Sequence, residues 1–451
     1  MKKISILFLS LFVFAACSSD DNNTGGDAKS DAKEITTFTF LASENEVLDE
    51  DVKATIDKEK KTIAVTVPSG TDITALKPTL TLSEKATVNP KDKAEVDFSD
   101  DVEYTVTAED GGTQKYIVTV NEERPLTERE ALIALYKANP DNQLDWDINE
   151  EDVSSWEGIT LTNGKVTKIV LDKKGITILP KEIGWLRELD TLNLRRNELP
   201  GLPTALKRLT KLKLLDLSST KIQDFPKALI DLNKELEFLD LSNNGFDKIP
   251  EVVLSLTNLK VLSIGNNPLG ELPSTIGDLE NLERLRLTGT QLSSLPREIG
   301  NLKKLTSIVL DYNRLKELPQ EIIELENLRA LWIVGNNLKI LPKRIFEIRW
   351  LTGLNVSENP LTELPPEIAN LSNLISLQAF RTELTTLPKA IGQLKKLKSL
   401  NIWDIDFESF PDEMSGLESL DFLNLNKSNE PLIPPAIFTI VKANGGQILF
   451  Q

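Results

Sequence analysis

Histidine is absent from this chain of 451 residues, and cysteine occurs once, as Cys17. Enzymes use histidine more often than any other side chain as a general base and as a metal ligand, so its absence removes much hydrolytic and zinc-dependent chemistry. The glycine-rich phosphate loops and nucleophile-elbow patterns of nucleotide-binding proteins and hydrolases are also missing. With 69 acidic residues, the sequence does not single out a carboxylate pair of the glycosidase kind. We therefore predict that the protein is not an enzyme and has no catalytic residue, no metal site and no cofactor.

Positive charge is scarce, because 52 Lys and Arg residues stand against 69 Asp and Glu, and the formal net charge is −17. A surface this acidic repels phosphate backbones and anionic lipid. No basic run with interleaved aromatic residues interrupts it. We expect no nucleic acid among the partners of this protein.

A hydrophobic run long enough to span a membrane is also missing at the N-terminus, where the apolar stretch Ile4 to Phe14 is shorter than the ~20 residues of a transmembrane helix. Two lysines precede this stretch and two alanines follow it, which is typical of a secretory signal peptide. The next residue, Cys17, resembles the cysteine of a bacterial lipobox, which is acylated and becomes the new N-terminus. We interpret residues 1–17 as a lipoprotein signal peptide and Cys17 as its lipidation site. The alternative is a plain secretory signal with an incidental cysteine.

The segment after Cys17 is small and polar. Ser18 to Lys33 contain no apolar residue larger than alanine, so we predict that residues 18–34 form a disordered tether. Ser18 to Asp21 resemble the short acidic tag that directs lipoproteins of some gut-dwelling Gram-negative bacteria to the cell surface. The resemblance implies a lipid anchor in the outer membrane and exposure at the cell surface.

Strict alternation of apolar and polar residues begins at Ile35. Thr62–Val67, Val102–Ala108 and Lys115–Val120 each place their apolar residues on one face, which indicates half-buried strands. Residues 35–122 therefore predict a small all-β sandwich of immunoglobulin-like type. It is similar to the immunoglobulin-like domains that follow the tether in many surface lipoproteins, which implies a spacer. We find no site in it.

A repeat of 23 residues fills most of the remaining chain, with the pattern L-x-x-L-x-L-x-x-N-x-L-x-x-L-P-x-x-I-x-x-L-x-x. Twelve copies run in register through residues 166–434, and only the third copy is one residue longer. The pattern resembles the leucine-rich repeat family, in particular its LPxxIGxL class. The copies begin at Val166, Leu189, Leu212, Leu236, Leu259, Leu282, Leu305, Leu328, Leu351, Leu374, Leu397 and Leu420.

The physical chemistry of the repeat predicts the same fold. No copy can bury its leucines alone, but stacked copies share one core, and their short strands then pair as a parallel sheet. The ninth position, usually Asn, must satisfy backbone groups at the turn, so we interpret it as scaffold. The fold class is therefore multidomain: an all-β immunoglobulin-like sandwich followed by an α/β leucine-rich repeat solenoid, a curved horseshoe with a parallel concave sheet.

The open ends of such a solenoid need caps. Residues 123–165 contain a helical pattern with Thr127 and Glu130 as a capping box, and predict an N-terminal cap. This segment resembles the cap of plant-type leucine-rich repeat receptors without its cysteine pair, so we expect Trp146 and Trp156 to hold it by packing. Residues 435–451 predict a closing helix and edge strand.

The concave face carries an aromatic group where most copies are polar. In this family the third, fifth, seventh and eighth residues of each copy point out of the sheet. Large apolar residues gather on these positions in the C-terminal half, whereas the N-terminal half carries charged residues, which are Asp216, Asp240, Arg195, Arg284 and Arg286. The predicted ligand-binding residues are Val309, Tyr312, Trp332, Val334, Phe380, Trp403, Arg284 and Arg286.

Exposed aromatics on a rigid sheet, edged by charged groups, are typical of a binding site. We predict a monomeric, cell-surface, lipid-anchored binding protein that recognises a protein ligand, with a glycan as the other ligand class. The alternative function is an envelope scaffold or self-association module. The alternative for the aromatics is that Trp332 and Trp403 lean on each other and cover backbone.

Overall fold

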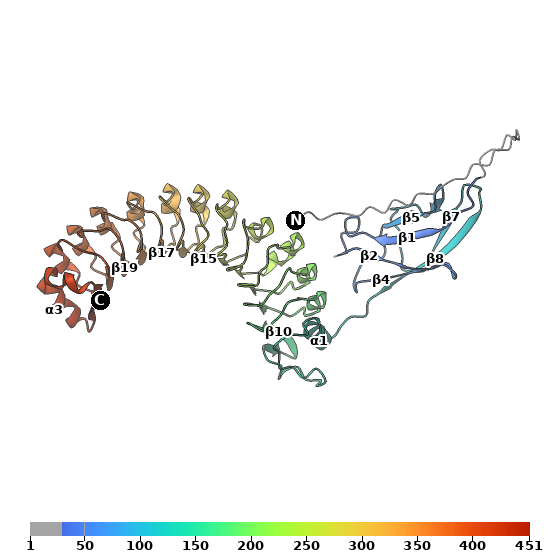
Figure 1. The fold of residues 1–451 in the computed structure, drawn as a ribbon, viewed down its shortest axis with the longest axis horizontal. Coiled ribbons are helices and arrows are strands. Elements are labelled where there is room, and N and C mark those ends of the chain that lie inside the picture. Colours follow the sequence, from blue (N-terminus) through green and yellow to red (C-terminus); the bar gives the residue numbers. More distant parts are fainter. Residues whose placement is uncertain (1–28, 49) are drawn as a thin grey trace, which may run out of the picture. The chain divides into compact units, whose positions relative to one another are not determined.

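The computed structural model describes residues 29–48 and 50–451, and they form two compact units that divide between Arg124 and Pro125 (Figure 1). The predicted signal peptide, Cys17 and the first part of the predicted tether lie outside the described residues. Within the described residues, no helix combines the length and the apolar character needed to cross a bilayer.

The first unit contains two sheets, as a sandwich requires. One has the strand order β2-β1-β5 and the other β3-β4-β8-β7-β6. Residues alternate between exposed and buried along β4, which confirms the strand periodicity seen in the sequence. The strands are β1 Ile35–Phe40, β2 Val52–Lys53, β3 Thr55–Asp57, β4 Thr62–Val67, β5 Pro78–Leu82, β6 Thr87–Asn89, β7 Val102–Thr107 and β8 Thr113–Glu122.

Aromatic rings fill the space between these sheets. Phe38 contacts the rings of Phe40, Phe98 and Tyr104 edge to face, at centroid distances of 5.5, 6.4 and 5.7 Å. The small all-β domain is confirmed, but it begins before Ile35. The N–H of Ser30 donates to a carboxylate oxygen of Glu109 (3.0 Å), so the end of the predicted tether lies against the domain.

The second unit is a solenoid built on one sheet of 14 strands, in the order β9 to β22. Neighbouring strands from β10 to β22 are parallel, and β9 pairs antiparallel with β10 at the N-terminal edge. The strands are β9 Ile159–Thr162, β10 Lys165–Val170, β11 Thr191–Asn193, β12 Leu214–Asp216, β13 Phe238–Asp240, β14 Val261–Ser263, β15 Arg284–Arg286, β16 Ser307–Val309, β17 Ala330–Trp332, β18 Gly353–Asn355, β19 Ser376–Gln378, β20 Ser399–Asn401, β21 Phe422–Leu425 and β22 Gln447–Phe450.

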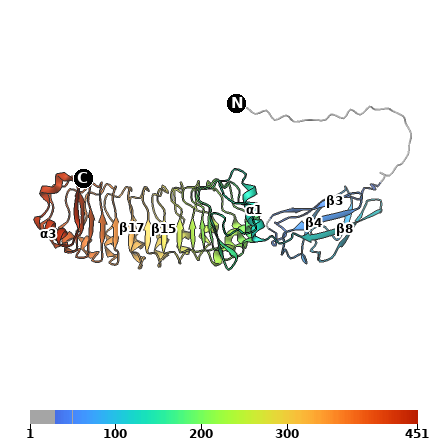
Figure 2. The same cartoon turned by 90° about the horizontal axis from the view of Figure 1, so that it is seen from below.

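Short helices line the convex side of the solenoid, opposite the strands (Figures 1 and 2). Between the caps, each helix is preceded by a proline, and most of these prolines are in extended conformation, such as Pro180 at φ −75°. Almost all of the helices are 3₁₀ rather than α-helices. They are η1 Lys181–Trp185, η2 Thr204–Arg208, η3 Lys227–Lys234, α2 Glu251–Leu254, η4 Ser274–Asp278, η5 Arg297–Asn301, η6 Gln320–Glu324, η7 Lys343–Glu347, η8 Pro366–Asn370, η9 Lys389–Gln393 and η10 Asp412–Gly416.

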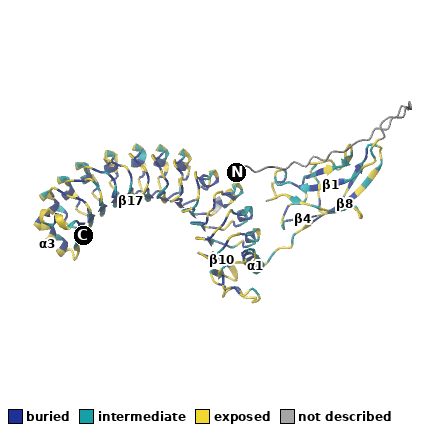
Figure 3. Cartoon of the chain, in the orientation of Figure 1, coloured by how far each residue is buried: buried dark blue, intermediate teal, exposed yellow. Residues whose placement is uncertain are grey.

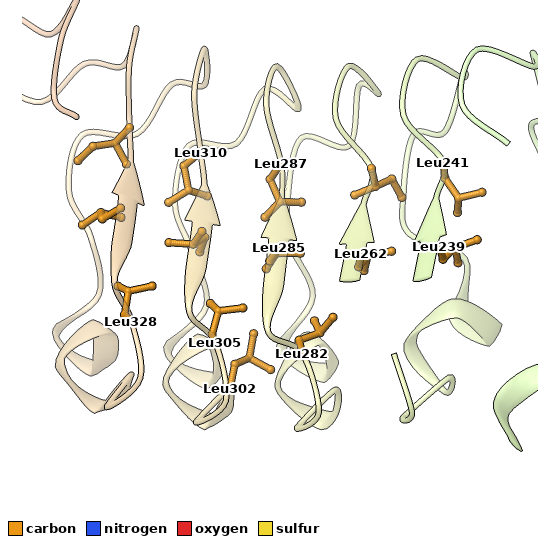
Figure 4. Close-up of a cluster of buried hydrophobic side chains, with 14 of the residues drawn as sticks. Leu239, Leu241, Leu262, Leu282, Leu285, Leu287, Leu302, Leu305, Leu310 and Leu328 are labelled. Carbon is orange, nitrogen blue, oxygen red and sulfur yellow. The ribbon is translucent and has the colours of Figure 1, made fainter. Parts of the chain in front are cut away.

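Leucines at the first, fourth and sixth positions of the copies stack between the sheet and the convex helices. Figure 4 shows them in successive copies, and Leu282, Leu285 and Leu287 of one copy are completely buried. Each copy therefore buries its apolar face against the copies on either side, at ~25 cal/mol per Å² removed from water. The predicted solenoid fold is confirmed.

Asparagines at the ninth position join the copies by hydrogen bonds. The side-chain amide of Asn313 donates to the carbonyls of Leu287 (2.8 Å) and Leu310 (2.9 Å). Its oxygen accepts from the N–H of Leu292 (2.9 Å). With the N–H of Thr290 and the carbonyl of Asp311, one buried side chain thus satisfies five backbone groups from two adjacent copies.

Both ends of the solenoid are closed. At the N-terminal end, helix α1 (Glu128–Ala138) begins with the Thr127–Glu130 capping box, and the rings of Trp146 and Trp156 stack 4.9 Å apart. At the C-terminal end, η11 (Lys427–Leu432) leads to helix α3 (Pro435–Ala443) and strand β22. Tryptophan packing therefore holds the N-terminal cap.

We expect Asn313→Ala to lower the free energy of unfolding by about 1–3 kcal/mol, because it leaves buried backbone groups without partners. Urea unfolding followed by circular dichroism measures this. Asn337→Ala, one copy further and exposed, is the control. Equal stability of the two variants would contradict the scaffold role of the ninth position.

Candidate ligand-binding face

The concave face is formed by side chains that alternate with the buried core positions. In β17 and the residues after it, Leu331 and Ile333 are fully buried while Trp332 is 41% exposed. The strands line the inner side of the arc in Figure 3, so Trp332 projects into the concavity. The stacked core holds these positions rigidly.

Trp332, Val309 and Tyr312 form the first apolar group, here called the Trp332 group. Val309 and Trp332 are register partners on β16 and β17. Tyr312 is 56% exposed and has a φ of +55°, which bulky residues rarely adopt. Its ring lies over Gly335, where an added Cβ would sit 2.5 Å from a ring carbon. A glycine in the next copy thus makes room for the tyrosine.

Val334 does not belong to the exposed face. Its side chain is only 6% exposed, and its N–H donates to a carboxylate oxygen of Asp311 (2.9 Å). The side chain of Val334 is therefore covered, whereas that of Trp332, two residues earlier, is not. The prediction that Val334 contacts a ligand is corrected.

Phe380 and Trp403 form a second group. Their centroids lie 6.0 Å apart, and the guanidinium of Arg381 lies 4.6 Å from the Trp403 ring centre. Arg381 is held by Asp404, with Nε to Oδ2 at 3.0 Å, and by Glu358, with Nη1 to Oε1 at 3.5 Å. The sequence reasoning missed this arginine, although it stands on the eighth-position row that was expected to face outward.

The two groups are separate. Trp332 makes no ring contact within the described part of the chain, whereas Trp403 does. Between the groups lie Asn355 and Ser357, both buried. The alternative in which Trp332 and Trp403 lean on each other therefore does not hold, and Trp332 presents a free aromatic surface.

The N-terminal half of the concave face is charged. Arg284 and Arg286 are both exposed on β15, as predicted. Asp240 on β13 is partly buried, and this burial raises the pKa of its carboxyl above the usual value. The neighbouring carboxylate of Asp216 adds to the rise. The arrangement offers charged groups to a ligand, and the described residues contain no cluster of three metal-ligating side chains.

Family models match both units of the chain. A model described as "SGBP, N-terminal" matches residues 35–120, which are the first unit's strands. A model described as "Leucine-rich repeat region" matches residues 204–289 and 327–432, and one described as "Leucine rich repeat" matches residues 280–338.

Solved structures similar to the chain are repeat proteins. A leucine-rich repeat protein of Leptospira interrogans is 32% identical, with a TM-score of 0.51, over 63% of this chain and 84% of that chain. The Arabidopsis receptor kinase HAESA, in complex with the peptide hormone IDA and the co-receptor SERK1, is 24% identical, with a TM-score of 0.56. This likeness covers 66% of this chain and 53% of that chain. The second likeness shows the fold alone.

Curated relatives match over shorter stretches. Leucine-rich repeat-containing protein 58 of Xenopus tropicalis is 33% identical over 97 residues, which are 21% of this chain and 27% of that protein. A probable serine/threonine-protein kinase, pats1, of Dictyostelium discoideum is 33% identical over 94 residues, 20% of this chain and 3% of that protein. The chain thus spans only a small part of the length of these relatives.

Gly335→Ala is expected to destabilise the protein more than Gly270→Ala. Both glycines have positive φ, +63° and +71°, so both substitutions introduce backbone strain of roughly 1–2 kcal/mol. Only the first also strikes a ring, that of Tyr312. Chemical unfolding compares the two variants. Adding Tyr312→Ala to Gly335→Ala should remove the extra destabilisation relative to Gly270→Ala. If the extra destabilisation persists, the assigned contact between the Tyr312 ring and position 335 is contradicted.

Asp240→Asn is expected to raise the melting temperature at pH 7. Because burial raises the folded-state pKa of Asp240, its contribution to stability is present at acid pH and is lost as pH rises through that pKa. The gain should therefore vanish towards pH 3, where the aspartate is protonated. Asp172→Asn is the control with the opposite sign. The hydrogen bond from Arg196 lowers the pKa of Asp172, so this substitution should lower the melting temperature at pH 7. Melting curves from pH 3 to 8 distinguish the two signs.

Proposed function

The chain belongs to the leucine-rich repeat family, and we propose that its solenoid is a binding module that takes a protein ligand on the concave face. The exposed side chain of Trp332 is the observation that carries this proposal. A large aromatic ring fixed on a rigid sheet gives contact area at little cost in conformational entropy, which is why tryptophan and tyrosine dominate the energetics of many interfaces. Tyr312, on the neighbouring copy, extends the same surface.

The architecture favours binding over catalysis. The parallel sheet presents many side chains in fixed rows, and the side chains that differ most from copy to copy stand on positions that the core does not use. HAESA, which shares the solenoid fold, is in complex with a peptide hormone and a co-receptor. A protein or peptide segment is accordingly the ligand class that we favour, and a glycan is the competing outcome of the test below.

We further propose that lipid on Cys17 anchors the protein in the outer membrane of a Gram-negative bacterium, facing the cell exterior. The order of a signal peptide, a cysteine and a polar tether supports this. The unit that follows would hold the solenoid away from the membrane. In that arrangement the concave face meets extracellular partners as a monomer.

Binding is tested with arrays of proteins, peptides and glycans probed by the purified protein and by Trp332→Ser. We expect peptide or protein ligands whose affinity falls at least tenfold in the variant, since an anchor residue contributes about 2 kcal/mol or more. Ile340→Ser, an exposed apolar residue of the same copy at 61% exposure, is the matched control. If Trp332→Ser retains the ligands, the Trp332 group is not the site. If only glycans bind, the ligand class is a glycan rather than a protein.

The anchor is tested separately in cells. Metabolic labelling with an alkyne fatty acid should mark the protein, and Cys17→Ala should abolish the label and release the protein from membranes. Protease added to intact cells should degrade the wild-type protein if it faces outward. A labelled protein that resists the protease would keep the anchor but place the protein on the inner side.

A further inference from the structure

Two carboxylates lie side by side on the concave face without a cation. Asp216 and Asp240 are register partners on β12 and β13, so their side chains project from adjacent positions. In the described residues neither forms an ion pair. Oδ1 of Asp216 accepts from Oγ of Ser218 (2.7 Å), and Oδ1 of Asp240 accepts from the N–H of Ser242 (2.8 Å). Both carboxylates are thus oriented by neutral donors and lack a paired cation.

A buried serine hydroxyl beside them also has no partner. Ser263 on β14 is the register partner of Asp240, and its side chain therefore points to the same face. It is 1% exposed, and its Oγ makes no hydrogen bond within the described structure. Buried polar atoms of this kind are rare in folded proteins and call for an explanation. Within the described structure this hydroxyl is thus unsatisfied, on the strand next to the two carboxylates.

The copy that holds Ser263 carries small residues on this face. Its fifth and seventh positions are Ser263 and Gly265, which are small and buried. On the far side, Arg286 is the next register partner and its side chain is exposed. Ser263 therefore has negative charge on one side and positive charge on the other. A cationic ligand group is favoured on the side of β12 and β13.

We infer that Asp216, Asp240 and Ser263 form a seat for a basic side chain of the protein ligand, which takes arginine in preference to lysine. A planar guanidinium has five donors in a fixed fork and can bridge two neighbouring carboxylates, whereas a lysine ammonium is a compact charge with three donors. The two carboxylates and one hydroxyl do not make a metal site, and no group of three metal-ligating residues occurs among the described residues. This inference rests on the proposed function.

Desolvation of Asp240 supports the seat. Burial raises the pKa of its carboxyl, which means that the charged form is poorly compensated in the free protein. The positive charge of Arg286 acts in the opposite direction, but its effect on this pKa is smaller than that of burial. A bound guanidinium would restore the missing compensation. A raised pKa is thus expected for a carboxylate whose cationic partner is supplied by the ligand.

The distance to the Trp332 group specifies the ligand further. Strand β13 and strand β17 are separated by three intervening strands, so four spacings of about 4.8 Å give roughly 19 Å along the sheet. An extended peptide advances about 3.3 Å per residue, so six residues cover this distance. Residues six apart lie on the same side of an extended chain. The ligand segment should carry an arginine and a large apolar residue about six positions apart.

Fluorescent peptides with one arginine and one tryptophan in a Gly/Ser/Thr background test the seat, with the two residues two, six or ten positions apart. The full chain is titrated with each peptide by fluorescence anisotropy. We expect the six-residue spacing to bind at least tenfold more tightly than the others. Replacing its arginine by neutral citrulline should weaken binding at least tenfold, and replacement by lysine should weaken it less.

The protein variants complete a double-mutant cycle. Asp216→Asn/Asp240→Asn should weaken the arginine peptide as much as citrulline does and leave the citrulline peptide unaffected. Asp278→Asn, an exposed carboxylate on convex helix η4, is the matched control. The double Asp→Asn variant retains the solenoid, because it replaces two carboxylates by isosteric amides.

The outcomes separate this inference from the proposed function. If Trp332→Ser abolishes binding while the double Asp→Asn variant binds arginine and citrulline peptides equally, the concave site stands and the cationic seat is overturned. If no peptide of the series binds to the folded protein, the seat is also overturned, and the arrays alone decide the proposed function. If the Asp→Asn variant loses binding but Trp332→Ser does not, the seat stands, and the same ligand does not contact the Trp332 group.

Discussion

Burial of each copy's leucines by the copies beside it is the interaction on which the rest of this protein depends. A single copy of 23 residues is too small to hold a core, and Leu282, Leu285 and Leu287 become fully buried only because neighbouring copies cover them. Asparagines such as Asn313 then tie the backbones of adjacent copies together at the turns. Stability and shape are therefore repeated at every copy, and the two caps have only to close the ends.

Because the core leucines and the asparagines provide the stability, the side chains on the concave rows can serve in binding. The fifth and eighth positions contribute little to the core, so they can hold groups that a compact protein would avoid. Trp332 remains exposed, and among the residues that the structure describes Asp216 and Asp240 have no ion-pair partner and the hydroxyl of Ser263 has no hydrogen bond. Each of these features disfavours the free protein slightly, and together they lie on one face. Such features accumulate at binding sites, where a ligand compensates for them.

Much of this organisation could be predicted from the sequence. The strict period of 23 determines the strand register, so the repeat pattern alone places Trp332 on the concave face. Short-range patterns were equally informative, as the Thr127–Glu130 capping box shows. The prediction for Val334 was wrong because periodicity gives the direction of a side chain and says nothing of what covers it. Arg381 was missed because its partners, Glu358 and Asp404, are each 23 residues away in the sequence.

The sequence by itself thus determined the fold, the register and the face on which the aromatic residues stand, because these follow from local periodicity repeated many times. Only the tertiary structure decided which of those residues are free. Contacts between copies cover Val334, place Arg381 over the ring of Trp403 and, in the described part of the chain, leave the buried hydroxyl of Ser263 without a hydrogen bond. These outcomes depend on side chains that meet through space across adjacent strands, and the shapes of those neighbours are set by packing rather than by the repeat pattern.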